Sequence, residues 1–320
     1  MKIGLIGYGN WGKNHARVLT ELGVLSGIYD QDKKIQKKIE SDGYKIFNSL
    51  KETSNESDGV VLATPAHTHF DLAKKIISST HLLIEKPIVL EIKDCKNLIK
   101  LSEKYKKKVM VGHQLHFHPA IMKMQEIIKN KEIGNIKWIY SNRLNMGRLR
   151  VNENVLWSFA PHDISLMNSF AKSDIKNISI QGTDILKKNN EDATLSLYQY
   201  KNGINAHIFA SWFHPFKEQR FIVVGTEGTL SFSDSDDKDK LKIYKTTITN
   251  FPNIDSHKDY VVKYEDSEPL KNQASYFIEI IKAKYSKTYI NSIYDAFQVM
   301  DVLDKSSKLL NKQRSNKNNR

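Results

Sequence analysis

The sequence contains very little cysteine: Cys95 is the only one in 320 residues. One cysteine cannot form an intrachain disulfide, and it argues against a thiolate metal site. No apolar run reaches the ~20 residues that span a bilayer, so we expect no membrane segment. The N-terminus carries a short apolar run with glycines, not a charged segment followed by a long apolar stretch, so we expect no signal peptide. These features predict a cytoplasmic protein.

Negative charge is also scarce, because 36 acidic residues face 49 basic ones and the formal net charge is +13. Such a charge is one mark of a nucleic-acid binder. The lysines, however, are scattered over expected helices, as at residues 33–38 and 104–108. Aromatic side chains do not alternate with them, as a base-stacking surface requires. We therefore expect no nucleic-acid partner and expect the charge to attract an anionic ligand.

The N-terminus carries the most informative motif. Residues 2–6 form an apolar run of strand length, and Gly7, Gly9 and Gly12 follow with the spacing G-x-G-x-x-G. Residues 14–22 then have a helical pattern. The first glycine allows the tight turn, the second lets a pyrophosphate approach the backbone, and the third allows close packing of helix and strand. A strand, this loop and a helix together predict a dinucleotide site.

An acidic residue completes this motif. A second apolar strand at residues 24–29 ends on Asp30, 18 positions after Gly12. A carboxylate there binds both ribose hydroxyls of an adenosine and repels a 2′-phosphate. Asp30 therefore favours NAD, although Lys33 and Lys34 just beyond it leave room for NADP.

Strand and helix patterns alternate through the first third of the chain, which predicts a doubly wound parallel sheet. The further strands are expected at residues 44–47, 59–63, 82–84 and 109–111, and the helices at residues 33–41, 70–78 and 92–105. Ligands of such sheets bind beyond the carboxyl ends of the strands. The residues expected at those ends are Gly7, Asp30, Thr64, Pro65, Glu85, Lys86, Pro87, Gly112, His113 and Gln114.

The pattern changes after Pro119 to one dominated by strands, which predicts an α+β domain with a large, mostly antiparallel sheet. Strands are expected at residues 136–144, 178–182, 193–200, 204–212, 219–225 and 229–233, and helices at residues 119–131, 162–170, 272–284 and 292–310. The predicted domains are residues 1–118 and 119–310. The polar, basic tail at residues 311–320 is expected to be disordered.

Two polar side chains are candidates for catalysis. Lys86 leaves the end of a buried strand beside the expected nicotinamide, where it can hydrogen-bond a substrate hydroxyl and steer its proton; a surface lysine at a loop start is the alternative. His162 lies at the start of a predicted helix, and its ordinary pKa suits a general base. A structural histidine is the alternative.

Three further histidines alternate in the segment HQLHFH. On an extended segment His113, His116 and His118 would share one side, as metal ligands do. No acid accompanies them, so we expect no metal site. His67 and His69 either contact the cofactor or cap a helix.

These motifs resemble the Gfo/Idh/MocA family of oxidoreductases over essentially the whole chain. The resemblance rests on GYGNWG (7–12), Asp30, ATPAHTH (63–69), EKP (85–87), GHQLHFHPA (112–120), PHD (161–163) and GTEGTLSF (225–232). It implies a Rossmann domain followed by an α/β domain whose open sheet forms dimers or tetramers. It also implies Lys86 and His162 as the catalytic pair.

The chain departs from this family at two positions. The acid that commonly stands four residues before the histidine is Ser158, and the usual glycine two residues before it is Ala160. This departure weakens an Asp–His relay and leaves His162 as the base, relayed by water, Ser158 or a ribose hydroxyl.

Residues 141–166 resemble members of the family that act on nucleotide-linked sugars, similar to the UDP-N-acetylglucosamine and UDP-N-acetylglucosaminuronate 3-dehydrogenases. Arg143, Arg148 and Arg150 suit a diphosphate, because guanidinium forks match phosphate oxygens; a solvated edge is the alternative.

The expected cofactor-binding residues are Gly7, Gly9, Asn10, Trp11, Gly12, Asp30, Thr64, Pro65, His69, Glu85, Lys86 and His113. The expected substrate-binding residues are Lys86, Arg143, Arg150, Asn154, Trp157 and His162.

Together these features predict an NAD-dependent dehydrogenase that oxidises a ring hydroxyl, at C3, of a nucleotide-linked sugar in surface-polysaccharide biosynthesis. The expected assembly is a homodimer or homotetramer. A free polyol, an inositol or a dTDP-ketosugar is an alternative substrate. A dinucleotide-binding sensor without catalysis is the alternative from another class.

Overall fold

The computed structural model describes residues 1–147, 149, 153–247 and 256–318, and the chain forms two compact units. The first unit contains Met1–Phe117 and Ser267–Met300, and the second contains His118–Asp266 and Asp301–Arg320. Of the helices in the described part of the chain, none combines the length and the apolar character needed to cross a membrane.

The first unit is built on a five-stranded parallel sheet in the order β2-β1-β3-β4-β5, which confirms the predicted doubly wound sheet. Its strands are β1 Ile3–Ile6, β2 Leu25–Tyr29, β3 Gly59–Leu62, β4 His81–Ile84 and β5 Val109–Val111. Its helices up to residue 117 are α1 Asn10–Glu21, α2 Lys33–Ser41, α3 Leu50–Asn55, η1 Ala66–Thr68, α4 His69–Ile76, α5 Ile92–Tyr105 and η2 Gln114–Phe117.

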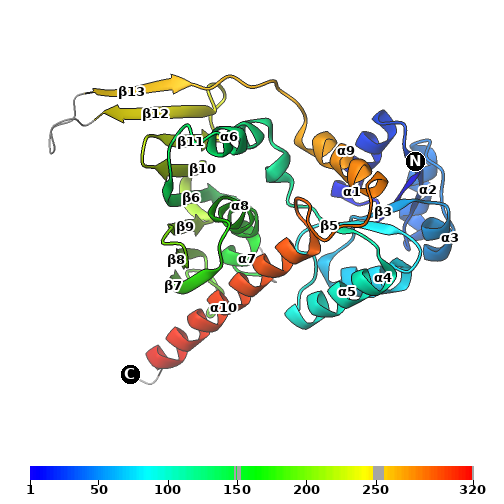
Figure 1. Cartoon of the computed structure of the whole chain (residues 1–320). Helices are drawn as coiled ribbons and strands as arrows, with labels where there is room; N and C mark the ends of the chain where they lie inside the picture. Colours follow the sequence, from blue (N-terminus) through cyan, green and yellow to red (C-terminus); the bar gives the residue numbers. More distant parts are fainter. Residues whose placement is uncertain (148, 150–152, 248–255, 319–320) are drawn as a thin grey trace. The chain divides into compact units, whose positions relative to one another are not determined.

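Apolar runs explain why these short strands lie inside the unit. Every residue of β1 and of β3 is buried, as expected for parallel strands covered by helices on both faces. Figure 1 shows α1 on one side of this sheet and α4 and α5 on the other.

Two local features differ from the sequence-based expectation. Residues 44–47 do not form a strand; Ile46 makes only an isolated bridge with Ile28. The helix α3 was not expected, although its signal is present. The Ser49 hydroxyl accepts a hydrogen bond from the Glu52 N–H, and the Glu52 carboxylate accepts one from the Asn48 N–H. This is the S-x-x-E pattern of a capping box, displaced by one residue on the return bond.

The first unit also differs from the predicted domain of residues 1–118, because it includes α9 Pro269–Lys282. Leu270, Ala274, Phe277 and Ile280 of α9 share one buried cluster with Ile3 and Leu5 of β1 and with Ala16 and Leu19 of α1. A segment far away in the sequence thus covers one face of the Rossmann sheet.

The second unit is built on an eight-stranded sheet in the order β13-β12-β11-β10-β6-β9-β8-β7. Its neighbouring strands are antiparallel except for the parallel pair β6 and β9, which confirms the prediction of a mostly antiparallel sheet. The strands are β6 Ile136–Met146, β7 Ile175–Thr183, β8 Ala193–Tyr200, β9 Asn205–Ser211, β10 Phe213–Gly225, β11 Thr229–Ser233, β12 Leu241–Thr247 and β13 Ser256–Val261. The helices are α6 Pro119–Lys129, α7 Val155–Phe159, α8 Pro161–Ala171 and the later part of α10 Ile293–Asn318. The tail predicted to be disordered from residue 311 is helical as far as Asn318.

The two faces of this sheet differ. Helices α6 and α8 lie against one face (Figure 1), where Ser141 and Tyr198 are buried. The opposite face carries Leu195 and Leu197, which are 46% and 43% exposed. Leu197 pairs with His207 across the strands, and His207 pairs with Tyr140 and stacks on its ring. The face turned away from the helices is therefore partly apolar.

Candidate active site

The carboxyl ends of the five parallel strands form one edge of the first unit's sheet. Residues that follow parallel strands meet at the same edge, whatever their distance in the sequence. The residues so placed are Gly7 after β1, Asp30 after β2, Thr64 and Pro65 after β3, Glu85 and Lys86 after β4, and Gly112 and His113 after β5. The topology thus gathers the candidate cofactor residues along one edge.

The three glycines of the N-terminal motif have different surroundings. Gly7 has φ +94°, a conformation that a side chain would strain, and a Cβ on Gly12 would overlap the carbonyl oxygen of Gly7. A Cβ on Gly9 would meet no atom within 4 Å. Gly9 is the N-cap of α1, and within the described residues no side chain caps this helix start. Its open backbone N–H groups and the free space over Gly9 fit the pyrophosphate of a dinucleotide.

Asn10 and Trp11 are the first two residues of α1. The Trp11 indole is 41% exposed and meets the His15 ring edge-on, with 6.1 Å between the ring centroids. Both residues therefore belong to the helix start that faces the expected pyrophosphate, and their contact with a cofactor stays a prediction.

Asp30 lies beside this loop. Its Oδ2 accepts a hydrogen bond from the Tyr8 N–H at 2.9 Å, and its Oδ1 accepts one from the Asp32 N–H at 3.0 Å. Two backbone donors thus orient the carboxylate, and its remaining lone pairs can accept hydrogen bonds from ribose hydroxyls. The loop and Asp30 together fit the adenosine half of NAD.

His69 connects two loops of the same edge. Its Nε2 lies 2.9 Å from the carbonyl oxygen of Thr64, and its Nδ1 lies 3.0 Å from that of Pro87. The ring is 1% exposed, and burial lowers its pKa although both carbonyls oppose this shift. A hydrogen bond from this ring to a cofactor would have to replace one of these contacts. His69, Thr64 and Pro65 as cofactor residues therefore stay predictions.

Glu85 and His15 form a pair that the sequence analysis missed. The Nε2 atom of His15 lies 2.8 Å from Glu85 Oε1, His15 is fully buried, and the Glu85 side chain is 13% exposed. Burial tends to raise the pKa of Glu85, but hydrogen bonds from His15, Trp11 and the Lys86 backbone lower it overall. The sequence feature that could have indicated this pair is a histidine on the apolar face of the helix that follows the glycine motif.

Lys86 and His113 follow the neighbouring strands β4 and β5. His113 is 3% exposed; burial lowers its pKa to about 3, and the nearby charges of His116 and Lys86 act in the same direction. At pH 7 His113 is therefore a neutral imidazole under the influence of the Lys86 cation. Lys86 itself is partly buried.

His162 is the second residue of α8; the residue is partly exposed, but its Nδ1 atom is buried. Ser158, on α7, is only 5% exposed. Its hydroxyl is buried and has no hydrogen-bond partner within the ranges that the structure describes. No carboxylate thus stands four residues before His162.

Arg143 is held within the protein by Asp163, the residue after His162. Its Nη2 donates to Asp163 Oδ1 at 2.8 Å and its Nε donates to Oδ2 at 3.0 Å. The Ser141 hydroxyl donates to the same Oδ1 at 2.8 Å, and Asp163 is fully buried. This ion pair attaches the start of α8 to β6. A diphosphate contact of Arg143 stays a prediction and would use the rest of the guanidinium. Arg148 and Arg150 lie outside the described residues.

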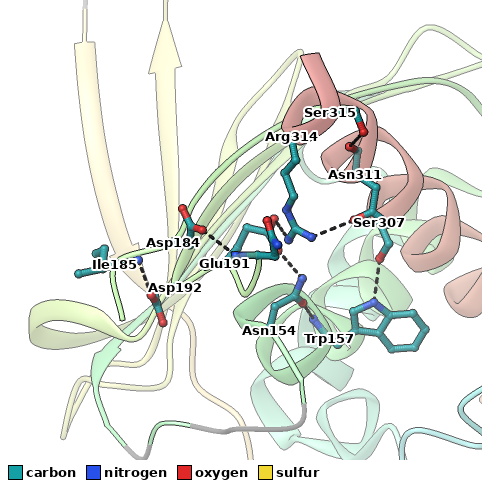
Figure 2. A network of polar contacts seen from close by, with 11 residues as sticks. Asn154, Trp157, Asp184, Ile185, Glu191, Asp192, Ser307, Asn311, Arg314 and Ser315 are labelled. Carbon is teal, nitrogen blue, oxygen red and sulfur yellow. Dashed lines mark hydrogen bonds and ion pairs between the residues drawn. The ribbon is translucent and has the colours of Figure 1, made fainter. Parts of the chain in front are cut away.

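Asn154 and Trp157 also make contacts within the second unit, shown in Figure 2. Asn154 Oδ1 accepts a hydrogen bond from the Trp157 N–H, and Asn154 Nδ2 donates to Glu191, which also pairs with Arg314 of α10. The Trp157 indole N–H donates to the Ser307 hydroxyl of α10 at 2.9 Å. These bonds hold α7 against α10, and substrate contacts of Asn154 and Trp157 stay predictions.

The HQLHFH segment is not extended, since Gln114–Phe117 form the 3-10 helix η2. His116 is buried, whereas His118 Nδ1 accepts a hydrogen bond from the Ala120 N–H at the start of α6. The segment thus lacks the extended conformation on which the predicted alternation of the three rings depended. In the described part of the chain, no group of three or more His, Cys, Asp or Glu residues is arranged to hold a metal ion.

Comparison with known proteins gives two family matches. Residues 1–113 match the oxidoreductase family with an NAD-binding Rossmann fold, and residues 121–231 match the GFO/IDH/MocA C-terminal domain. The UDP-N-acetylglucosamine 3-dehydrogenase of Acidithiobacillus ferrooxidans is 23% identical over 288 residues, which are 88% of this chain and 89% of that protein. The glucose-6-phosphate 3-dehydrogenase of Bacillus subtilis is 26% identical over 139 residues, 42% of this chain and 40% of that protein.

Solved structures share the fold. The A. ferrooxidans UDP-N-acetylglucosamine 3-dehydrogenase GnnA superposes with a TM-score of 0.86 at 21% identity, covering 97% of each chain. GenD2 from gentamicin A biosynthesis, solved with NAD, has a TM-score of 0.77 at 19% identity and covers 97% of this chain and 93% of its own. With the glycine loop, Asp30 and both family matches in agreement, the chain belongs to the Gfo/Idh/MocA family of oxidoreductases and carries its NAD-binding Rossmann domain.

Proposed function

We propose that the protein oxidises a ring hydroxyl, at C3, of a UDP-linked sugar, with NAD as the cofactor. The observation that carries this proposal is the similarity to a UDP-N-acetylglucosamine 3-dehydrogenase over 88% of the chain. A role in surface-polysaccharide biosynthesis is part of the proposal. A cytoplasmic location stays a prediction from the low cysteine content.

NAD, when bound, supplies the hydride acceptor. The chain's own residues have to orient the hydroxyl and remove its proton. In this proposal the Lys86 ammonium hydrogen-bonds the hydroxyl oxygen and stabilises the negative charge that develops on it. His162 accepts the hydroxyl proton as a neutral imidazole. The substrate thus loses one hydride and one proton, and the carbinol becomes a ketone.

His162 works here without the carboxylate that the family commonly supplies. Because Ser158 stands at that position, we expect the proton to leave His162 through water, the Ser158 hydroxyl or a ribose hydroxyl. In the reverse direction the same residues would reduce a 3-ketosugar.

The first experiment follows reduced nicotinamide by absorbance. The protein is mixed with NAD and, separately, with UDP-N-acetylglucosamine, its uronate, myo-inositol or glucose. Reduction with a UDP sugar alone supports the proposal, and reduction with a free polyol replaces it by the alternative dehydrogenase. If NAD binds but none of these compounds reduces it, the protein is next mixed with NADH and a 3-ketosugar. Failure there would favour a non-catalytic sensor.

Variants test the two catalytic roles. Lys86→Met and His162→Asn should each lower kcat by roughly 10²–10⁴-fold, the usual contribution of proton transfer, while NAD still binds. Lys74→Met is the matched control, because Lys74 is an exposed lysine of α4. Full activity in Lys86→Met would contradict the role of the lysine.

We also propose that copies of the chain associate through the open face of the eight-stranded sheet. The support is the partly apolar row that includes Leu195, Leu197 and Tyr140 on the side away from α8. Exposed apolar patches of this kind favour protein contacts. The double variant Leu195→Lys/Leu197→Lys should reduce the mass measured by light scattering. An unchanged oligomer would exclude this face.

A further inference from the structure

The buried pair of His15 and Glu85 lies at the edge where cofactor and substrate chemistry is expected. Glu85 directly precedes Lys86, and its Oε2 accepts the backbone N–H of Lys86 at 3.3 Å. Its Oε1 faces His15 Nε2 at 2.8 Å, on the helix whose start offers N–H groups to the pyrophosphate. One carboxylate therefore joins the cofactor-binding helix α1 to the backbone of the candidate catalytic lysine.

A third element fixes this carboxylate independently. A Cβ on Gly112, the residue after β5, would lie 2.7 Å from Glu85 Oε2 and 2.9 Å from both Oε1 and the carboxyl carbon. Real Cβ atoms do not approach other heavy atoms so closely. The absence of a side chain at residue 112 is thus a condition for the position of the Glu85 carboxylate.

The hydrogen bond pattern also indicates what His15 supplies. An ionised carboxylate can only accept, so His15 Nε2 must carry a proton and donate it. His15 Nδ1 is buried and has no hydrogen-bond partner among the residues that the structure describes. His15 thus contributes a hydrogen-bond donor in a fixed position.

Stability alone is a weak explanation for this pair. Buried ionic or polar pairs can often be replaced by well-packed apolar residues without loss of stability. A buried carboxylate beside a reactive group is, in contrast, a common feature of functional sites.

We propose that His15 is a positioning residue that, through the Glu85 carboxylate, holds the backbone of Lys86 in place relative to the helix that binds the cofactor. The proposal rests on the proposed function of Lys86. It assigns Glu85 a role within the protein in addition to its predicted contact with the cofactor.

The test uses the full-length protein with two His15 variants. His15→Gln places an amide N–H close to the position of Nε2 and should keep kcat within about threefold of the native value. His15→Met removes the donor and should lower kcat at least tenfold, while the Kd for NAD, measured by calorimetry, changes less than threefold. Gly112→Ala should reproduce the His15→Met result, because it displaces the carboxylate without altering either partner. His81→Gln, at the other end of β4, is the matched control and should leave kcat unchanged.

Hydrogen exchange supplies a readout that needs no substrate. In His15→Met, exchange at the Glu85 and Lys86 amides should quicken, while exchange at the His81 end of β4 stays native. Native kcat and native exchange in His15→Met would overturn the proposal, as would an equal loss of kcat in His15→Gln. If the native protein oxidises no sugar yet the local exchange change is found, the proposed function fails and the positioning role stands. If the native protein is active and exchange in His15→Met is unchanged, the proposed function stands and the positioning role fails.

Discussion

The guanidinium of Arg143, whose side chain is only 16% exposed, is bonded to the fully buried carboxylate of Asp163. Removing one partner of such a buried pair costs about 3–5 kcal/mol, because the other charge is left uncompensated. Loss of activity in an Arg143 variant would therefore not by itself identify a phosphate ligand. The measurement has to separate sugar-nucleotide affinity from stability.

Asp30 gives a sharper test at the residue scale. Asp30→Asn keeps the shape of the side chain and one acceptor for the backbone N–H groups of Tyr8 and Asp32, but it removes the negative charge. We expect weaker NAD binding and a rise of about tenfold in the affinity for NADP relative to NAD, which corresponds to about 1.4 kcal/mol. Titration of both cofactors measures the ratio. Asp32→Asn, two residues away, should leave that ratio unchanged.

Buried histidines predict how stability depends on pH. Burial lowers the pKa of His113 to about 3 and that of His116 to about 4. The unfolded chain takes up these protons near pH 6.5, so unfolding is favoured as the pH falls from there toward the folded pKa values. Each histidine should lower the free energy of unfolding by up to about 1.4 kcal/mol per pH unit in that window.

Urea unfolding at pH 7.5, 6 and 5 measures this slope. His116→Gln removes one titrating group. The unfolding free energy should then change less per pH unit, by about the contribution of one histidine. An identical slope in the native protein and the variant would contradict the assignment of His116 as a buried neutral imidazole.

At the scale of elements, the turn from β1 into α1 depends on two glycines for different reasons. A Cβ on Gly12 would overlap the Gly7 carbonyl, whereas the space over Gly9 is free. In Gly12→Ala the added methyl group should therefore push α1 away from β1. We expect this change to lower both the melting temperature and the affinity for NAD. Gly9→Ala should keep the melting temperature within about 2 °C and weaken NAD binding alone, because its methyl group enters the space that fits the pyrophosphate.

Calorimetry for unfolding and titration for NAD separate the two effects. Equal melting temperatures for both alanine variants would mean that helix and strand are less closely packed than the Gly12 contact indicates. Unchanged NAD affinity in Gly9→Ala would exclude the pyrophosphate from that space.

The predicted bounds agree best with the structure for elements whose sequence carries a strong local signal. The predicted helices at residues 33–41 and 92–105 and the strand at residues 193–200 coincide with α2, α5 and β8. Asp32 caps α2 through the Lys34 N–H, and β8 alternates between buried and exposed residues. The strands β12 and β13 and the short helix α7 were not expected. β13 has no buried residue, so no apolar alternation marks it.

At the scale of the whole molecule, α9 belongs with the Rossmann sheet although more than 200 residues separate it from α1. Phe277 is fully buried in the cluster that contains Ile3 and Leu5. Phe277→Ala should cost about 3–5 kcal/mol and destabilise the first unit.

Hydrogen exchange of the full chain shows which unit is affected. Amides of β1 and β3 should exchange faster in Phe277→Ala, while those of β8 and β9 should not. Glu279→Ala, on the exposed side of α9, is the control. Faster exchange in β8 and β9 alone would contradict the placement of α9 with the first unit.

The sequence by itself determined the features that depend on neighbouring residues. The glycine spacing, the acid after the second strand and the apolar runs specify a dinucleotide loop and a set of parallel strands, and parallel pairing then brings Asp30 and Lys86 to one edge. Tertiary structure alone decided which polar side chains have partners inside the protein. Arg143 meets Asp163, and Glu85 meets His15, because packing joins segments that are 20 and 70 residues apart. No local pattern encodes such contacts, since they arise only when the elements pack together.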